Sequence, residues 1–393
     1  MFINNHRKNA IAITLTALLG SSHAYSDIEV DISYLQQEID YGPVLSNILP
    51  EPEDAGFQGA KLAIKDSNTT GRFLKHKYQL QDFTSADPQA LIDKAKAQYE
   101  AGIRYFVVNT DAQTLGKFTE ALGKDALIFN AGSSADELRL HTCEANLFHT
   151  MPSRAMLADA LAQWLKAKRL QKIFMITGAT PDDKAFSRAF KRSAKRFGLS
   201  IVKEKDWSFD TDLRRTAQSE MPLFTQHRDY DVVFVADERG DFGEYVLYNT
   251  WLPRPVVGTQ GLTPVAWHRV VEQYGAAQLQ SRFEKNTKRW MNSKDYSAWA
   301  AVRSVAEAVT RTQTNDAETN KAYIKSDKFQ LAGFKGRKLD FRSWNGQLRQ
   351  TIPLVHPRSL VSMSPQDGFL HPTNELDTLG FDRKETDCTD TSK

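Results

Sequence analysis

Short apolar runs alternate with helical patterns along most of this chain, and this alternation restricts the possible folds more than any other feature. Runs of strand length lie at 28–35, 78–83, 103–108, 126–129, 172–176, 232–236 and 256–258. Between them, apolar residues recur at every third or fourth position, as they do on the buried face of a helix. Alternating strands and helices are typical of α/β proteins with parallel sheets. The chain is therefore predicted to be an α/β protein.

The alternation of strands and helices pauses near Met151 and Pro152 and then begins again, which predicts two Rossmann-like lobes with one parallel sheet each. A chain of 393 residues is also long for a single core. A hairpin is expected within residues 333–349. From residue 364, Pro, Asp, Gly and Thr become frequent and the periodicity stops. Residues 364–393 are therefore predicted to form an irregular C-terminal tail.

The first 24 residues have the three-part layout of a secretory signal peptide. Basic residues at 6–8 precede an apolar run at 10–19, and small residues lead to a cleavage point after Ala24. The alternative is a membrane anchor, but the apolar run is well short of the roughly 20 residues that cross a bilayer. We therefore expect export, a mature chain that begins near Tyr25, and a location in the periplasm if the cell is Gram-negative.

The charged residues are nearly balanced, with 51 basic and 48 acidic side chains and a net charge of +3. This balance favours neither nucleic acid nor a membrane surface as a partner. The most basic local run has the spacing of a solvated helix face. Its members are Lys191, Arg192, Lys195 and Arg196.

The chain has two cysteines, Cys143 and Cys388. Exported proteins meet an oxidising compartment, where disulfides persist. We predict that the two cysteines pair and hold the tail against the main body. The alternative is a pair of free thiols, because a contact between them does not follow from their spacing.

The motifs of common enzymes are missing from the sequence. It has no GxSxG elbow, no GxxxxGK[ST] phosphate loop, no GxGxxG after a strand and no HExxH. The nine histidines are scattered, and the spacing of His141 and His149 around Cys143 matches no common zinc pattern. We therefore expect no catalysis, no metal site and no cofactor.

Polar and small residues follow the predicted strands, at the edge where ligands bind in parallel α/β lobes. The candidates in the first lobe are Asn109, Thr110, Asp111, Ala131, Ser133 and Ser134. The candidates in the second lobe are Asp182, Asp237 and Glu238, and Gln260 lies at a passage between lobes. For each polar residue, the alternative is that it only caps its helix. The pattern predicts the place of a ligand site without naming the ligand.

Several segments in order resemble one family. Residues 56–64 (GFQGAKLAI), residues 149–153 (HTMPS), residues 255–262 (PVVGTQGL), and Phe341 with residues 345–346 (NG) match its motifs. The chain is similar to the type I periplasmic binding proteins of the leucine/isoleucine/valine-binding kind. Within that family it resembles most the substrate-binding proteins of ABC transporters linked to PQQ-dependent alcohol dehydrogenase systems.

The resemblance implies a monomer whose two lobes, joined by three crossings, close on a small solute and deliver it to a membrane permease. It places residues 25–150 and 259–335 in lobe 1, and residues 151–258 and 336–363 in lobe 2. It implies no catalysis. The alternative function is that of a periplasmic sensory or interaction protein, which keeps the binding fold without serving a permease.

The amino-acid site of the family is poorly kept. The family's second-lobe tyrosine aligns with Asp182, and its glycine–tyrosine pair is replaced by Asp237 and Glu238. A ligand carboxylate beside buried, unpaired carboxylates would cost about 3–5 kcal/mol. We therefore expect that the ligand is not a branched-chain amino acid. A neutral alcohol-type or oxidised metabolite, or a cation, is favoured instead.

Overall fold

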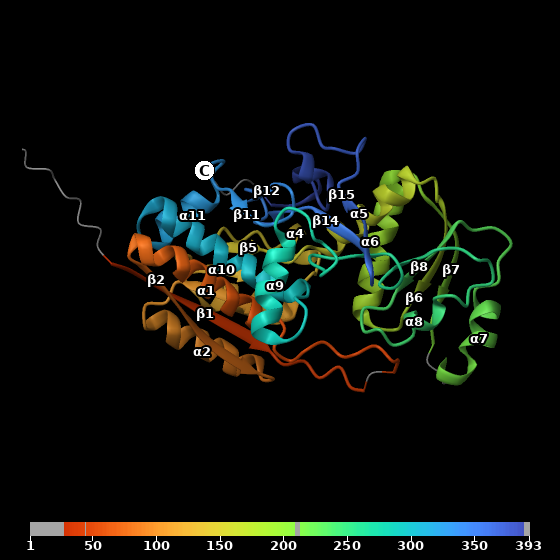
Figure 1. Cartoon of the computed structure of the whole chain (residues 1–393), viewed down its shortest axis with the longest axis horizontal. Coiled ribbons are helices and arrows are strands. Elements are labelled where there is room, and N and C mark those ends of the chain that lie inside the picture. Colours follow the sequence, from red (N-terminus) through yellow and green to blue (C-terminus); the bar gives the residue numbers. More distant parts are fainter. Residues whose placement is uncertain (1–26, 44, 209–212, 389–393) are drawn as a thin grey trace, which may run out of the picture.

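The computed structural model describes residues 27–43, 45–208 and 213–388. The predicted signal peptide and its cleavage point lie outside the described residues. The described chain forms two lobes, each built on a parallel sheet with helices on both faces (Figure 1). The expected α/β class and the two Rossmann-like lobes are confirmed.

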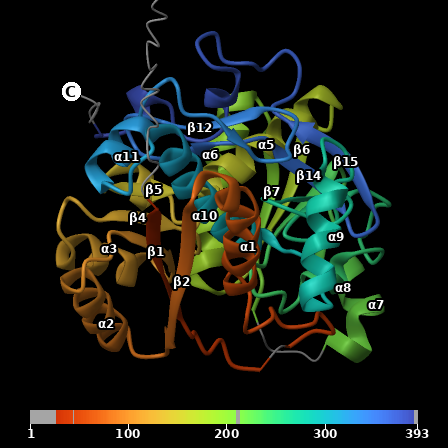
Figure 2. The ribbon, with the colours of Figure 1, turned by 60° about the vertical axis from the view of Figure 1, so that its left-hand side comes forward.

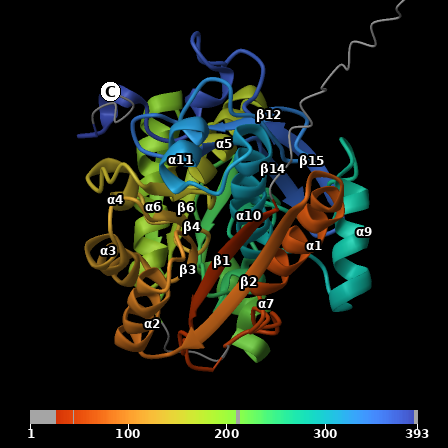
Figure 3. The same cartoon turned by 90° about the vertical axis from the view of Figure 1, so that its left-hand side faces the viewer.

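Lobe 1 has a five-stranded parallel sheet in the order β2-β1-β3-β4-β5. Its strands are β1 (Ile28–Gln37), β2 (His76–Ser85), β3 (Tyr105–Asn109), β4 (Leu127–Asn130) and β5 (Leu147–His149). One face of the sheet is covered by α1 (Phe57–Leu74), α9 (Ala276–Thr287), α10 (Ser293–Thr312) and α11 (Ala317–Ile324). The other face is covered by α2 (Pro88–Glu100), α3 (Ala112–Ala121) and α4 (Glu137–Leu140). Figure 3 shows β1 and β2 between these two groups of helices.

Lobe 2 has a four-stranded parallel sheet in the order β7-β6-β8-β9. Its strands are β6 (Lys172–Thr177), β7 (Ser200–Asp206), β8 (Val232–Ala236) and β9 (Val256–Gly258). Apolar residues of α5 (Arg154–Ala167) and α6 (Pro181–Phe197) pack on one face. Those of α7 (Leu213–Phe224) and α8 (Gly243–Val246) pack on the other. In both lobes the strand order changes direction beside the first strand, so loops from neighbouring strands meet at the carboxyl edge.

Local signals place the helix ends. The Asp87 side chain accepts a 2.9 Å hydrogen bond from the amide of Gln89, and Pro88 takes the first position of α2. Gly198 ends α6 with φ of 67°, a left-handed conformation that glycine adopts at little cost. None of the helices in the described residues is both long and apolar enough to span a membrane.

Two small antiparallel sheets lie between and above the lobes. The first consists of β10 (Thr263–Pro264), β14 (Ile352–His356) and β15 (Ser359–Ser364). The second consists of β11 (Leu331–Ala332), β12 (Lys338–Phe341) and β13 (Leu348–Arg349), which form the expected hairpin. Leu262 and Ile352 belong to the core of lobe 2, whereas Ala266 and Leu348 belong to that of lobe 1. The chain therefore crosses between the lobes near residues 150–153, 262–266 and 348–352.

The third crossing differs from the expected boundary at residue 336. Phe341 packs edge-on against Phe148, with ring centroids 5.2 Å apart, and also contacts Phe129. These contacts place β12 and β13 in the core of lobe 1 together with Leu339 and Leu348. The boundary is about a dozen residues later than predicted because the apolar hairpin is buried by lobe 1 rather than by lobe 2.

The predicted disulfide is present. The sulfur atoms of Cys143 and Cys388 are 2.08 Å apart, and the Cα atoms are 5.1 Å apart. Residues 365–388, called the C-terminal tail below, contain two short 3₁₀ turns, η1 (Glu375–Thr378) and η2 (Arg383–Glu385), in otherwise irregular chain. Many polar contacts besides the disulfide hold this tail. Two of them correct the expected solvated face of α6, because Arg192 and Arg196 bind the tail.

Candidate functional site

The candidate residues lie in the loops that follow the parallel strands, called the strand-end loops below. The loop after β4 belongs to lobe 1, and the amino end of α5 belongs to lobe 2. The amide of Arg154 donates a 3.0 Å hydrogen bond to the carbonyl of Ser134, and the amide of Ala155 donates to Asp136 Oδ1 at 2.9 Å. The first crossing thus brings the strand-end loops of the two lobes into direct contact.

The three candidates after β3 form part of the scaffold of lobe 1. The Asn109 amide, which is buried, donates 3.1 Å hydrogen bonds to the Tyr34 hydroxyl and to the carbonyl of Ala55. Asp111 caps α3 by accepting a 2.7 Å hydrogen bond from the amide of Thr114. Thr110 donates its hydroxyl to the carbonyl of Asp111 at 3.1 Å. Asp111 therefore caps a helix, as the alternative to ligand binding predicts for the polar candidates.

The loop after β4 is held from both sides. The Asn130 side chain accepts hydrogen bonds from the amides of Gly132 and Ser133, at 3.2 and 2.9 Å. Arg139, a buried residue of α4, donates to the carbonyl of Ser133 at 3.0 Å. A Cβ added to Gly132 would lie 2.5 Å from the side-chain oxygen of Asn109, which leaves no room for it. The structure therefore brings the candidates after β3 and β4 together, with Ala131 fully buried between them.

In lobe 2, an arginine that the sequence analysis did not select connects two candidates. Arg154 Nε donates to Glu238 Oε1 at 2.6 Å. Its Nη2 donates to Glu238 Oε2 at 2.7 Å and to Asp182 Oδ1 at 2.6 Å. Burial lowers the pKa of Arg154, but the hydrogen bonds and the charge of Glu238 outweigh this effect and raise it. Burial raises the pKa of Glu238, and Arg154 offsets part of that rise.

A sequence signal for this arginine does exist. Arg154 follows the cap residue Ser153 and stands at the first position of α5. A cation is unfavourable beside the positive end of a helix dipole, so an arginine at this position is stabilised by carboxylate partners. The sequence does not show that those partners come from loops 28 and 84 residues away.

Asp237 shapes its own loop. Its two carboxylate oxygens accept hydrogen bonds from the amides of Asp241, Phe242 and Gly243, at 2.9, 2.9 and 2.6 Å. Burial raises the pKa of Asp237, and these three amides offset part of the rise. Gln260 packs beside this loop, since a Cβ on Gly243 would lie 2.7 Å from Gln260 Cγ.

Asp183 follows the candidate Asp182 in the sequence and helps to position a second candidate, Glu238. It completes a capping box at the start of α6 with Thr180. Its Oδ1 accepts a 2.7 Å hydrogen bond from the amide of Glu238. The loops after β6 and β8 are therefore fixed to each other through the Glu238 backbone.

A segment from lobe 1 reaches the strand-end loops of lobe 2. Residues 38–43 and 45–56, which belong to the connection from β1 to α1, run below the sheet of lobe 1 toward α8 (Figures 1 and 2). The amide of Asn47 donates a 2.7 Å hydrogen bond to Glu244, and Arg239 donates to the carbonyl of Tyr41.

The Tyr41 side chain in this segment is about half exposed. Partial burial raises the pKa of its hydroxyl; Lys294 opposes this rise, while Asp182, Glu51 and Asp111 add to it. Lys294 itself donates a 2.5 Å hydrogen bond to Glu51.

Three cations near the strand-end loops form ion pairs: Arg154 with Asp182 and Glu238, Lys294 with Glu51, and Arg239 with Asp241. Arg139, which holds the loop after β4, donates to backbone carbonyls instead. The described part of the chain contains no group of three or more His, Cys, Asp and Glu side chains that could hold a metal ion. This arrangement can receive hydrogen-bonding or cationic groups more readily than a carboxylate.

Comparisons with known proteins agree with this geometry. Residues 52–242 match the family model described as periplasmic binding protein. No curated protein sequence matches the chain.

Solved structures of the same fold are known. A branched chain amino acid ABC transporter periplasmic ligand-binding protein from Burkholderia xenovorans is 16% identical with a TM-score of 0.68, covering 93% of this chain and 100% of that one. An ABC transporter substrate-binding protein from Desulfitobacterium hafniense in complex with Leu is 15% identical with a TM-score of 0.62, over 86% and 100%. A solute-binding protein from R. palustris in complex with benzoate is 13% identical with a TM-score of 0.61, over 84% and 92%.

The fold is that of the type I periplasmic binding proteins of the leucine/isoleucine/valine-binding kind, as the resemblance implied. The family model that matches residues 52–242 describes binding proteins rather than enzymes.

Proposed function

We propose that this protein is the exported solute-binding component of an ABC transporter, which closes two lobes on a small molecule and delivers it to a membrane permease. One observation carries the proposal: two parallel α/β lobes, joined by three crossings, meet through the loops at the carboxyl ends of their strands. In such lobes, loop amides and helix amino ends bind the ligand, and contacts to both lobes favour the closed state.

The ligand proposed here is a neutral or cationic small molecule rather than a branched-chain amino acid. The guanidinium of Arg154 binds Asp182 and Glu238, so it is engaged before any ligand carboxylate arrives. The related proteins crystallised with Leu and with benzoate hold ligands that carry a carboxylate. The carboxylates in this chain disfavour such ligands and favour an amine or an uncharged alcohol.

A link to PQQ-dependent alcohol oxidation belongs to the same proposal. It rests on the resemblance of the chain as a whole to the substrate-binding proteins of ABC transporters linked to PQQ-dependent alcohol dehydrogenase systems. The solutes it suggests are alcohols and their oxidation products. An acid product would meet the same repulsion as an amino acid, which favours the alcohol or the aldehyde as the transported species.

A thermal-shift screen tests the ligand class, because a ligand that binds only the folded state raises the melting temperature by mass action. The compounds are leucine, benzoate, primary alcohols with their aldehydes and acids, small amines, PQQ, and divalent and trivalent metal ions. We expect a rise with alcohols or amines and none with leucine, followed by calorimetry on each hit. Micromolar binding of leucine would contradict the proposed ligand class.

A further inference from the structure

The C-terminal tail contacts both lobes in alternation. It leaves β15 on lobe 2, where the Gln366 amide donates a 3.0 Å hydrogen bond to Gln163 of α5. The Gln163 side chain also donates to the Thr378 hydroxyl at 3.0 Å. Leu379 is fully buried in the core of lobe 2. The tail thus begins as part of lobe 2, and it lies along the upper edge of the molecule in Figure 1.

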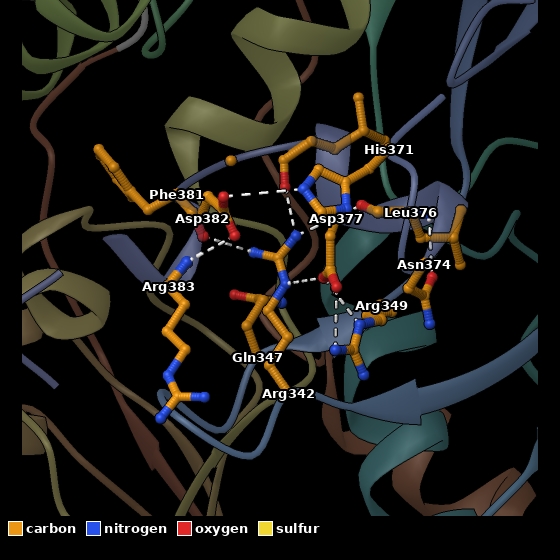
Figure 4. A network of polar contacts seen from close by, with 12 residues as sticks. Arg342, Gln347, Arg349, His371, Asn374, Leu376, Asp377, Phe381, Asp382 and Arg383 are labelled. Carbon is orange, nitrogen blue, oxygen red and sulfur yellow. Dashed lines mark hydrogen bonds and ion pairs between the residues drawn. The ribbon is translucent and has the colours of Figure 1, made fainter. Parts of the chain in front are cut away.

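At Asp377 the same tail binds lobe 1. Arg342 Nε and Arg349 Nε, both from the β12–β13 hairpin, donate to Asp377 Oδ1 at 2.8 and 2.7 Å (Figure 4). Arg349 Nη2 donates to Asp377 Oδ2 at 3.0 Å. Arg342 donates further hydrogen bonds to the carbonyls of Leu379 and Phe381, at 2.7 and 3.1 Å. Because Arg342 is 1% exposed and Asp377 is 3% exposed, water screens these contacts little.

Three residues later, the tail returns to lobe 2. The Gly380 amide donates to Asp159 Oδ2 of α5 at 2.8 Å. Its carbonyl accepts 3.1 Å hydrogen bonds from Arg192 and Arg196 of α6. Arg192 also binds Glu385 at 2.7 Å.

The tail ends on lobe 1. The Asp387 amide donates a 3.0 Å hydrogen bond to the carbonyl of Leu140, at the end of α4. Asp387 also pairs with His141 at 2.6 Å. The Cys388–Cys143 disulfide then joins the tail covalently to the segment between α4 and β5.

These contacts lie beside two of the three crossings. A Cβ on Gly380 would lie 2.7 Å from Met156 and 3.6 Å from Ser153, at the first crossing. Arg349, at the end of β13, lies in the third crossing. Gln350 in that crossing donates a 2.9 Å hydrogen bond to the carbonyl of Thr150 in the first. The two crossings and the tail therefore form one packed and hydrogen-bonded unit.

We propose that the C-terminal tail is a clamp on the hinge, which limits rotation of the lobes about the crossings. Asp377 is fixed to lobe 1, and Gly380 is fixed to lobe 2. The two residues between them, Thr378 and Leu379, are buried and hydrogen-bonded and cannot follow both lobes when these rotate apart. Rotation must therefore break the ion pairs of Asp377 or the contacts of Gly380, and the disulfide keeps the end of the tail from leaving lobe 1.

The clamp is tested by measuring distances between the lobes in the protein without ligand. Spin labels attached to non-natural residues at the exposed positions Lys96 on α2 and Lys203 on β7 leave the two cysteines untouched. Pulsed electron spin resonance then gives the distance distribution. We expect a narrow distribution for the wild type and about a twofold wider one for the C143S/C388S and D377N variants, since each removes a tie between tail and lobe 1.

The matched control is R104Q, which removes an arginine–carboxylate pair with Asp125 (2.7 Å) that lies within lobe 1. Its distribution should equal that of the wild type. Reduction of the folded wild type with dithiothreitol, which converts the disulfide to two thiols, provides the same comparison if a variant does not fold. Unchanged widths in D377N and in the reduced protein would overturn the clamp. Because no ligand is present, failure of the proposed transport function leaves this result unaffected.

Discussion

At the residue scale, Arg154 neutralises part of the negative charge of the strand-end loops of lobe 2. Its side chain is 9% exposed, and it binds Glu238 through both carboxylate oxygens and Asp182 through one. Bidentate pairing between a guanidinium and a carboxylate fixes geometry as well as charge. Arg154 therefore converts two carboxylates that would repel each other into one ordered cluster beside the first crossing.

We predict that R154Q lowers the free energy of unfolding by about 2–3 kcal/mol. Removing one partner of a fully buried ion pair costs about 3–5 kcal/mol, and Asp182 and Glu238 here are partly exposed, which reduces the loss. Urea denaturation measures it. R188Q is the control, because Arg188 is an exposed residue of α6. A loss below about 0.5 kcal/mol, the usual range of a surface substitution, would show that the cluster contributes no stability.

The sequence located most candidate residues at strand ends, because strand ends follow from local hydrophobic periodicity. It could not show which of them face one another. Asp237 and Asp111 were selected as ligand residues, and their carboxylates cap local turns and helices. Arg154 was not selected, since its partner Glu238 is 84 residues away and only the fold brings them together.

At the element scale, the β12–β13 hairpin shows what hydrophobic periodicity can predict. It predicts that a hairpin forms, but it does not predict which lobe the hairpin packs against. Its alternating pattern predicted a hairpin correctly. The assignment to lobe 2 was wrong because the hairpin buries Phe341 among Phe129, Phe148 and Phe329 of lobe 1. The alternation along a strand indicates which of its faces is apolar. It does not indicate which surface covers that face, because here the covering residues are about 200 positions earlier in the chain.

We predict that F341A destabilises the protein by about 3–5 kcal/mol, the usual cost of removing a buried phenylalanine ring. Phe341 is 4% exposed. The loss should appear first in lobe 1, as faster hydrogen exchange of β3 and β4 with little change in β6 and β8. F73A is the matched control, since Phe73 on α1 is 87% exposed. Equal acceleration in both lobes would contradict the assignment of the hairpin to lobe 1.

At the scale of the whole molecule, the tail was the segment least accessible to sequence reasoning. Its composition predicted irregular structure, and the disulfide followed from the cysteine count and the expected compartment. The run of Lys191, Arg192, Lys195 and Arg196 indicated a solvated helix face, yet two of its arginines are bound by Gly380 about 185 residues later. Helical spacing shows that a face is polar, but it does not show what covers that face.

We predict that C143S/C388S lowers the free energy of unfolding by about 3–5 kcal/mol. The disulfide closes a loop with a sequence separation of 245 residues. The chain-entropy model gives about 5 kcal/mol for a loop of this length, and measured values fall at or below such estimates. Calorimetry of the wild type and the variant measures the loss.

Because the tail belongs to both lobes, we also expect one transition in the wild type and two separate transitions, one for each lobe, in the variant. The prediction fails if the variant shows a single transition and its free energy of unfolding is lower by less than about 1 kcal/mol. The crossings alone would then couple the lobes, and the disulfide would only fasten the end of the tail.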